Sequence, residues 1–590
     1  MIVALVLLGC SGESTPTPDP VPDPAPVAPA PDPKRDWTLE FNNVKIEDSM
    51  LMATAPTSTT WAMVDGKRAD IDFMRIYTRG EDGFGDLVDG AGAPIDDVCN
   101  NQDFDAVLEA AGHPWLVSHF ECTPGEIYLT RLKKDADGKL SPDFNKRVDF
   151  SAVGGVWNPC AGVVSPWGTH VGSEEYEPNA RVVPQRGGKD TWDARAWFGQ
   201  ERYLPGGGPL QPYLYGWTPE VRILDADGNT SVVKHKAPGR FSHEVAYILP
   251  DERTVYLSDD GGAEGFFMFV ADRPKDLSSG YLYAARWKQR TAQPIEAEIS
   301  WINLGHADNA SIDALIGAGV TFDDLFEVAE PNGFVCPDGF RFTHTDYEKE
   351  CLKLREPSEK VPDPAMAASR LETRRYAAVL AATTEFEKGE GVTFDPATGR
   401  VFISLSKVTR RMLEEPGAPD DHIKLPENDC GVILEGKTDK GVVDSSKNLI
   451  GSLHVITGFE QVVAGTPLDQ PDPRGNTCFE NGIANPDNIT YLPGYDILMV
   501  GEDTSAHAVA SLWAIEDRKH TLKRVLVSPP HGEITGIHWT PNLQGHGYLT
   551  VAVQHPWKAE TLEDTQLPEG ITAEHQKSIT GILGPFPALD

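Results

Sequence analysis

Five residues able to bind metal ions each stand at the head of the same local pattern. In this pattern a thiol or carboxylate precedes a short apolar segment, a turn containing Pro or Gly, and a second β-rich run. The five residues are Cys160, Glu175, Glu244, Glu390 and Glu533. A repeated unit with an acid at one end can gather carboxylates from distant parts of the chain at one point. The pattern therefore predicts a site for several metal ions.

Further acids flank apolar strand residues in the same way. They are Asp259, Asp260, Asp487, Glu502 and Asp503. Taken singly, such an acid is more often a turn-forming residue or an exposed charge at a strand end. As a set at equivalent repeat positions, these acids favour a site for a hard cation such as Ca²⁺, which takes several oxygen ligands.

Cys160 adds a soft sulfur ligand to this oxygen-rich set. A thiolate among carboxylates indicates a transition metal in addition to Ca²⁺. An isolated buried cysteine usually serves core packing, but Cys160 lies within the motif Asn158-Pro-Cys-Ala-Gly162. We therefore expect Cys160 to bind metal.

The remaining cysteines after Cys10 fall into neighbouring pairs. The pairs are Cys99 with Cys122, Cys336 with Cys351, and Cys430 with Cys478. Six cysteines allow many connectivities, and neighbouring pairing is the one that we expect in an oxidising compartment.

Strand signals dominate the chain after its first 35 residues. Short runs rich in Val, Ile, Tyr and Phe follow turns at 255–258, 401–404, 497–500 and 548–553. Helical signal is concentrated at 346–382 and reads as an insertion. Antiparallel units too numerous for a sandwich predict an all-β fold, a β-propeller, in which the inner strand ends converge on the central channel.

The composition limits the partners. With 52 basic and 89 acidic residues, the 590-residue chain has a formal net charge of −37. This balance argues against a nucleic-acid partner, which needs a basic face, and against electrostatic docking on anionic lipid. It is compatible with a secreted protein that attracts divalent cations.

The amino terminus predicts export. An apolar run from Met1 to Gly9 ends in Leu-Leu-Gly followed by Cys10, which is typical of a bacterial lipobox with lipidation at the cysteine. A Pro-, Asp- and Ala-rich tract follows and would form a stiff stalk. The predicted organisation is a signal segment at 1–10, a linker at 11–35, and one propeller domain at 36–590 with an insertion around 340–382.

The chain resembles the PhoX-type bacterial alkaline phosphatases. The motifs that carry the resemblance stand in family order between about residues 145 and 560: Cys160-Ala-Gly, Pro166-Trp-Gly-Thr169, Glu174-Glu175, Gly239-Arg-Phe-Ser-His-Glu244, Glu390-Gly391, Asn485-Pro-Asp-Asn488, Glu533-Ile-Thr-Gly536 and Gln554-His-Pro556. The resemblance implies a six-bladed propeller whose channel holds a cluster of iron (Fe³⁺) and calcium (Ca²⁺) ions that cleaves phosphate monoesters.

The resemblance also implies roles for individual residues. Cys160 would bind iron, and Glu390 would bridge metals or contact them near the substrate. The ligands that would share the iron and calcium ions are Glu175, Glu244, Asp487 and Glu533, with Asp259 or Asp260 among them. We expect the histidines His170, His243, His538 and His555 to support ligands rather than to bind metal.

One departure from the family concerns the phosphate-binding cation. The family has Arg-Pro-Glu where this chain has Lys388-Gly-Glu390, and a lysine offers a point charge where an arginine offers a bidentate clamp. We assign Lys388 and Glu390 to catalysis and Lys388 to substrate binding. The sequence leaves the choice between Arg410 and Arg411 as a second phosphate ligand open, and Arg411 is the one that we name. Another departure is Val163, where the family has a glycine.

These observations predict an exported, metal-dependent alkaline phosphatase that uses an oxygen nucleophile bound to the metal cluster. Its substrate would be a small phosphate ester, its only membrane contact a lipid at Cys10, its location the periplasm or cell surface, and its state a monomer. Two alternatives stay open: a catalytically inactive calcium-binding surface propeller, and a calcium-dependent propeller lactonase or phosphotriesterase. Neither alternative requires the thiolate of Cys160.

Overall fold

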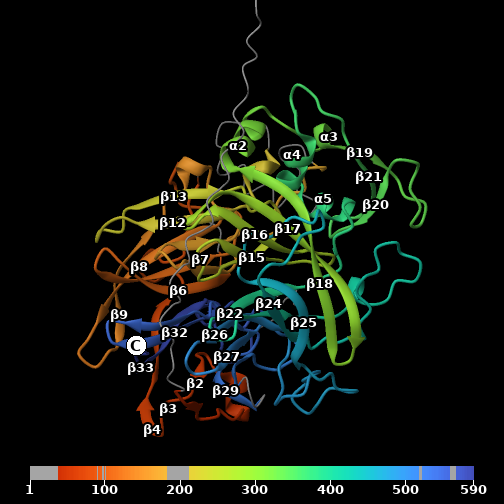
Figure 1. Ribbon diagram of the computed structural model, residues 1–590. Helices are drawn as coiled ribbons and strands as arrows, with labels where there is room; N and C mark the ends of the chain where they lie inside the picture. The colour runs from red at the N-terminus through yellow and green to blue at the C-terminus, as the bar shows by residue number, and fades with distance from the viewer. Residues whose placement is uncertain are drawn as a thin grey trace, which may run out of the picture. The chain divides into compact units, whose positions relative to one another are not determined.

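The computed structural model describes residues 37–89, 91–95, 99, 101–182, 211–516, 521–558 and 567–589. Strands are the main elements of this part, and its helices are few and short (Figure 1). No helix within it is long and apolar enough to cross a membrane. The expected signal segment, the linker and the lipidation of Cys10 lie outside the described residues, so the division of the chain into domains stays a prediction.

The described strands form six blades whose inner strands contact one another in sequence around a ring. The inner strands are β6 (Gln102–Ala110), β10 (Gly162–Val164), β14 (His243–Ile248), β22 (Gly389–Asp395), β26 (Pro486–Leu492) and β30 (Glu533–Thr535). The last blade closes the ring because β31 (Trp539–Leu543) and β32 (His546–Gln554) contact β6. The predicted all-β propeller is therefore confirmed.

Each blade continues outward as an antiparallel meander. The first two blades add β7 (His113–Phe120), β8 (Glu126–Lys134) and β9 (Leu140–Arg147), and β11 (His170–Gly172), β12 (Thr218–Ile223) and β13 (Thr230–His235). The third adds β15 (Thr254–Asp259), β16 (Phe266–Arg273), β17 (Asp276–Ala292) and β18 (Ile295–Asp308). The fourth adds β23 (Arg400–Leu405), β24 (Val432–Asp439) and β25 (Val455–Ala464). The fifth adds β27 (Ile497–Glu502), β28 (Ser511–Glu516), β29 (Thr521–Val527) and the short β2 (Thr57–Ser58).

Two features join parts of the chain that are distant in sequence. In the sixth blade, β33 (Ile579–Pro587) pairs with β5 (Asp72–Thr78), so strands from both ends of the described chain complete one sheet. The third and fourth blades share an edge, because β18 pairs with β25 and makes one nine-stranded sheet. The long β17–β18 hairpin is visible in Figure 1. A separate small sheet contains β1 (Leu39–Phe41), β3 (Trp61–Val64) and β4 (Lys67–Asp70).

The chain between β18 and β22 forms the main inserted region. It contains the helices α2 (Asn309–Gly317), α3 (Phe322–Leu325), α4 (Pro364–Leu371) and α5 (Thr373–Val379) and a sheet of β19 (Phe326–Ala329), β20 (Arg341–His344) and β21 (Lys349–Leu354). Asp308 caps α2 by accepting a hydrogen bond from the Ser311 amide, and Asp363 caps α4 in the same way; both caps satisfy amides that a helix start leaves unpaired. The remaining elements are short 3₁₀ turns: Asp48–Met52, Glu81–Gly83, Ser151–Val153, Pro212–Leu214, Arg410–Met412 and Ala573–Gln576.

The blades pack face to face, which explains why the second strand of a blade is buried along most of its length. All six residues of β15 and all six of β27 are buried, as expected for strands covered on both faces. The three expected disulfides, Cys99–Cys122, Cys336–Cys351 and Cys430–Cys478, are confirmed. Cys160 is free and buried, which leaves its thiol available for chemistry.

Candidate metal centre

Four inner strands carry a β-bulge at the same position, near their first residues. The pairing with the next strand shifts between Gln102 and Asp105 in β6, and between Gly389 and Val392 in β22. The same shift occurs in β14 and β26. A bulge redirects the side chain that it contains, and the four bulges contain Asp103, Glu244, Glu390 and Asp487. Each of these blades therefore presents one carboxylate at the start of its inner strand.

A left-handed backbone conformation recurs two residues before four of the ligand candidates. Asn158, Lys388, Asn485 and His531 have φ of 36°, 51°, 45° and 58°, and they precede Cys160, Glu390, Asp487 and Glu533. Non-glycine residues rarely adopt this left-handed conformation because Cβ approaches the neighbouring carbonyl. Such strain is concentrated at functional sites, so the four loops are built to place the residue that follows.

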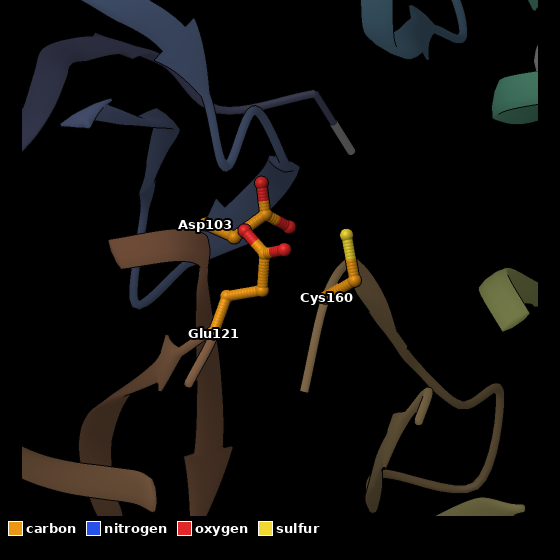
Figure 2. A group of neighbouring side chains, drawn as sticks. All are labelled: Asp103, Glu121 and Cys160. Carbon is orange, nitrogen blue, oxygen red and sulfur yellow. The ribbon is translucent and has the colours of Figure 1, made fainter. Parts of the chain in front are cut away.

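The bulges and loops bring their side chains together in three overlapping groups. Within each group the ligand atoms lie within 4.8 Å of one another. The groups are Asp103, Glu121 and Cys160; Cys160, Glu175 and Glu244; and Glu244, Asp260 and Glu390. Figure 2 shows the first group, in which the Cys160 thiol faces the two carboxylates. The thiol also donates a hydrogen bond to Glu244 Oε2 at 2.9 Å.

Asp487 and Glu533 extend the centre. Burial raises the pKa of the Asp487 carboxyl well above its usual range, and the charge of Glu390 adds to this effect. Burial also raises the pKa of Glu533, with the charge of Asp503 as the next cause. Asp503 is exposed, so the centre reaches solvent on the side of the fifth blade.

The centre concentrates negative charge away from water. Burial raises the pKa of the Cys160 thiol well above its usual range, and burial with the Glu121 charge raises the pKa of Asp103 to about 8. Burial and the charge of the neighbouring Asp260 raise the pKa of Glu390 to about 7. Buried carboxylates are stable when a cation balances them, so this arrangement favours cation binding.

The residues present fit metal ions of two kinds. Within the described residues, Asp103 Oδ2 and Asp260 Oδ1 are buried and have no hydrogen-bond partner. Unpaired buried oxygens are costly, and a bound cation would satisfy them. Carboxylates alone suit Ca²⁺, whereas the groups that contain Cys160 also suit a transition metal such as iron.

Hydrogen bonds hold several ligand candidates in place. Asn158 Nδ2 donates to Glu121 Oε1 at 3.1 Å and to Glu175 Oε2 at 3.2 Å. The Tyr176 hydroxyl donates to Asp260 Oδ2 at 2.6 Å. Such contacts orient carboxylates before a metal binds.

The structure places most of the residues named from sequence in the centre. Cys160, Glu175, Glu244, Asp260 and Glu390 belong to the three groups, and Asp487 and Glu533 adjoin them. Lys388 Nζ lies 2.6 Å from Asp260 Oδ2 and 3.1 Å from Glu390 Oε1.

Asp259 and Arg411 lie outside the three groups. Arg374 on α5 holds Asp259, with Nη2 2.7 Å from Oδ1 and Nε 3.0 Å from Oδ2, so the structure favours Asp260 of the two neighbouring aspartates. Arg411 is buried in ion pairs with Glu415 and Asp420, whereas the side chain of Arg410 is 69% exposed.

Sequence reasoning missed Asp103 and Glu121. Asp103 is the second residue of β6, the position that Glu244, Glu390 and Asp487 occupy in their own strands. Glu121 directly follows β7. The shared strand position was one available signal for Asp103. The first blade also carries the repeated pattern, with the apolar run Ala106-Val-Leu108 and a turn that contains Gly112 and Pro114, so the pattern extends to this blade and leaves Asp103 and Asp105 as its two candidates.

The fold and site define a β-propeller with a buried carboxylate and thiol centre. The alkaline phosphatase PhoX family model matches residues 131–557. The chain therefore belongs to the PhoX alkaline phosphatase family, which confirms the resemblance and makes it a phosphoric ester hydrolase.

One solved structure supports the fold. The structure of Pseudomonas fluorescens PhoX in complex with vanadate, a transition state analogue, matches with a TM-score of 0.59 and 16% identity, over 93% of this chain and 98% of that chain. A putative 6-phosphogluconolactonase from Bacteroides uniformis matches with a TM-score of 0.27 and 11% identity, over 78% of this chain and 97% of that chain. No curated protein sequence matches the chain.

Proposed function

We propose that the chain is an exported alkaline phosphatase that hydrolyses phosphate monoesters at the centre between its inner strands, with iron and calcium as cofactors. The observation that carries the proposal is the convergence of the Cys160 thiol and buried carboxylates from several blades within ligand distance. A purely structural core has no need for so many buried acids, because each costs free energy unless a cation balances it.

Cys160 would hold iron, together with carboxylates of the two groups that contain it. The carboxylates of Asp487 and Glu533 adjoin these groups beside Asp503, and their oxygens suit calcium. When bound, the ions would neutralise charge on the phosphoryl oxygens and activate the attacking oxygen.

The chain's own residues would orient the substrate. The Lys388 side chain is 29% exposed, so its ammonium can offer a donor to a phosphate oxygen at the open side. Glu390 lies beside it, and its Oε1 accepts a hydrogen bond from the Ser406 hydroxyl at 3.0 Å, which fixes the carboxylate. Arg410 rather than Arg411 has an exposed guanidinium, so we assign a second phosphate contact to Arg410.

Two further observations support the proposal. The Pseudomonas fluorescens relative was solved with vanadate as a transition state analogue, which favours a phosphate ester as the substrate of this chain also. The three disulfides favour an oxidising compartment, in line with export and with a lipid at Cys10. We expect a monomer with no nucleic-acid partner.

The test combines metal content with turnover. We would measure iron and calcium by elemental analysis, and p-nitrophenyl phosphate hydrolysis at alkaline pH, on the same sample of protein purified without chelator. Cys160→Ser should lose iron and activity, because a hydroxyl is a poor ligand for a metal that selects thiolate. The control replaces the disulfide-bonded pair Cys336 and Cys351, which lies outside the three groups, with serine and should keep both properties.

Two results would contradict the proposal. If the Cys160→Ser protein kept its iron and its full turnover, the thiol would have no role in the centre. If the unaltered protein contained calcium without iron and hydrolysed no phosphate ester, a calcium-binding surface propeller would be the better description.

A further inference from the structure

The third group of the centre already has a cation beside it. Glu244, Asp260 and Glu390 are buried, and their ligand atoms lie within 4.8 Å of one another. The ammonium of Lys388 lies 2.6 Å from Asp260 Oδ2 and 3.1 Å from Glu390 Oε1. Two of the three carboxylates that could hold a metal ion therefore bind a side chain of the same protein.

The backbone holds Lys388 in this position from both sides. Its amide donates to the Gly261 carbonyl at 2.9 Å, and its carbonyl accepts from the Ser406 amide at 3.0 Å. Its φ is 51°, a conformation that a lysine adopts only when its surroundings impose it. Because Gly261 follows Asp260 directly, the same turn positions both members of the ion pair.

We propose that Lys388 is a built-in cation that takes the place of one metal ion at the Glu244, Asp260 and Glu390 group. This inference rests on the proposed function, because it assumes that the other groups hold metal. An ammonium is a compact point charge with three donors. Two of them face Asp260 and Glu390, and the third is left for a phosphate oxygen.

The chemistry of the group identifies the ion that Lys388 excludes. The ligands are oxygens alone, which suit Ca²⁺, and Asp260 Oδ1 is buried without a hydrogen-bond partner in the described part of the chain. A divalent ion at this group would lie within a few ångströms of the ammonium, and like charges at such a distance repel strongly inside a protein. The affinity of the group for Ca²⁺ should therefore be at least about tenfold lower with Lys388 than without it.

The experiment counts calcium ions. Protein stripped with chelator and reloaded with iron is titrated with Ca²⁺ by calorimetry, and the bound calcium is checked by elemental analysis. Lys388→Met removes the charge at similar length and should bind one more Ca²⁺ per chain than the unaltered protein. Lys388→Arg keeps the charge and should bind the same number. Lys437→Met removes an exposed lysine that pairs with Glu460 and is the control for loss of one positive charge.

A second measurement needs no variant. Acetic anhydride labelling of the unaltered protein, read by mass spectrometry, reports whether the Lys388 ammonium leaves the group. The proposal predicts slow labelling of Lys388 with and without saturating Ca²⁺.

Three outcomes would overturn the inference. The first is the same calcium count and affinity in Lys388→Met as in the unaltered protein. The second is a clear rise in Lys388 labelling when Ca²⁺ is added, because calcium would then displace the lysine. The third is an unaltered protein that binds no metal, which would overturn the proposed function as well, whereas the first two leave that function intact.

Discussion

Replacing Arg374 with methionine tests how the inserted helices support the centre. Arg374 on α5 is 2% exposed. It pairs with Asp259 at 2.7 Å, with Glu177 at 3.6 Å and with Glu264. All three carboxylates are buried, so the variant leaves three buried acids without this cation.

The expected loss follows from the cost of breaking a buried ion pair, which is about 3–5 kcal/mol. Unfolding entropy is about 2.1 cal/mol/K per residue, which amounts to about 1.2 kcal/mol/K for the unit Asp36–Asp590. The thermal midpoint of Arg374→Met should therefore fall by about 3–4 °C. Differential scanning calorimetry at pH 8 measures this fall.

The pH dependence has a defined sign. Burial raises the pKa of Glu177 and, more strongly, of Glu264. A protonated carboxyl needs no cation, so the destabilised variant recovers as the pH falls and these groups take up protons. The difference in midpoint between the two proteins should be largest at pH 8 and should narrow towards pH 5.

A double variant provides the control. Adding Asp259→Asn to Arg374→Met removes one of the orphaned charges and should recover part of the lost stability, so the two changes are not additive. A midpoint within 1 °C of the unaltered protein for Arg374→Met, or full additivity with Asp259→Asn, would refute the reasoning. Asp259→Asn alone should leave the metal content unchanged, because Asp259 lies outside the three groups.

Three more predictions concern packing, acid stability and the disulfides. A Cβ at Gly391 would lie 2.8 Å from a backbone oxygen of β26, so Gly391→Ala should lower the midpoint and the turnover of p-nitrophenyl phosphate at a cost of about 1–3 kcal/mol; unchanged turnover would contradict this. Burial lowers the pKa of His538 to about 4, so the folded state loses up to about 3 kcal/mol of stability as the pH falls from about 6.5 to 4. In calorimetry, the thermal midpoint of His538→Phe should fall less over that pH range than the midpoint of the unaltered protein. The Cys430–Cys478 bond closes a loop of 48 residues, so replacing both cysteines with alanine should destabilise the protein by about 4 kcal/mol, and a denaturation midpoint that does not move would count against this estimate.

The strands that sequence predicted share one place in the fold. The runs at 255–258, 401–404, 497–500 and 548–553 lie in β15, β23, β27 and β32, each the second strand of its blade. These strands are covered on both faces, so most of their residues are buried. Each strand contains an apolar run that is recognisable without an alignment. The inner strands carry polar residues for the centre, and their pattern is weaker.

The first blade shows where the sequence signal ends. Its inner strand β6 begins Gln102-Asp-Phe-Asp105, with one aspartate on each side of a phenylalanine. Asp103 joins the centre, whereas Asp105 accepts a hydrogen bond from Gln102 Nε2 at 3.0 Å and another from Ser118. Which aspartate faces the centre depends on the bulge, and the bulge is a property of strand pairing that the local sequence does not encode.

Asp259 and Asp260 pose the same problem with a more distant cause. The two are neighbours in sequence, yet Asp259 binds Arg374 and Asp260 joins the centre. Arg374 lies 115 residues further along the chain, in the inserted region. A resemblance to family motifs can identify the pair, but only the packing of α5 against the third blade selects between its members.

The left-handed residues before the ligand candidates connect these observations with the chemistry of the centre. Asn158, Asn485 and His531 occupy the same position as Lys388 in their own loops. The two asparagines have uncharged amides at this position. The Asn158 amide donates to Glu121 and Glu175, and the Asn485 amide donates to backbone carbonyls. Lys388 is the member of this set that is long and permanently charged, so it can reach back to Glu390 in its own loop and across to Asp260. A lysine at this position therefore changes the charge of the centre without changing the backbone that builds it, which is why calcium counting is a sharper test of its role than loss of stability.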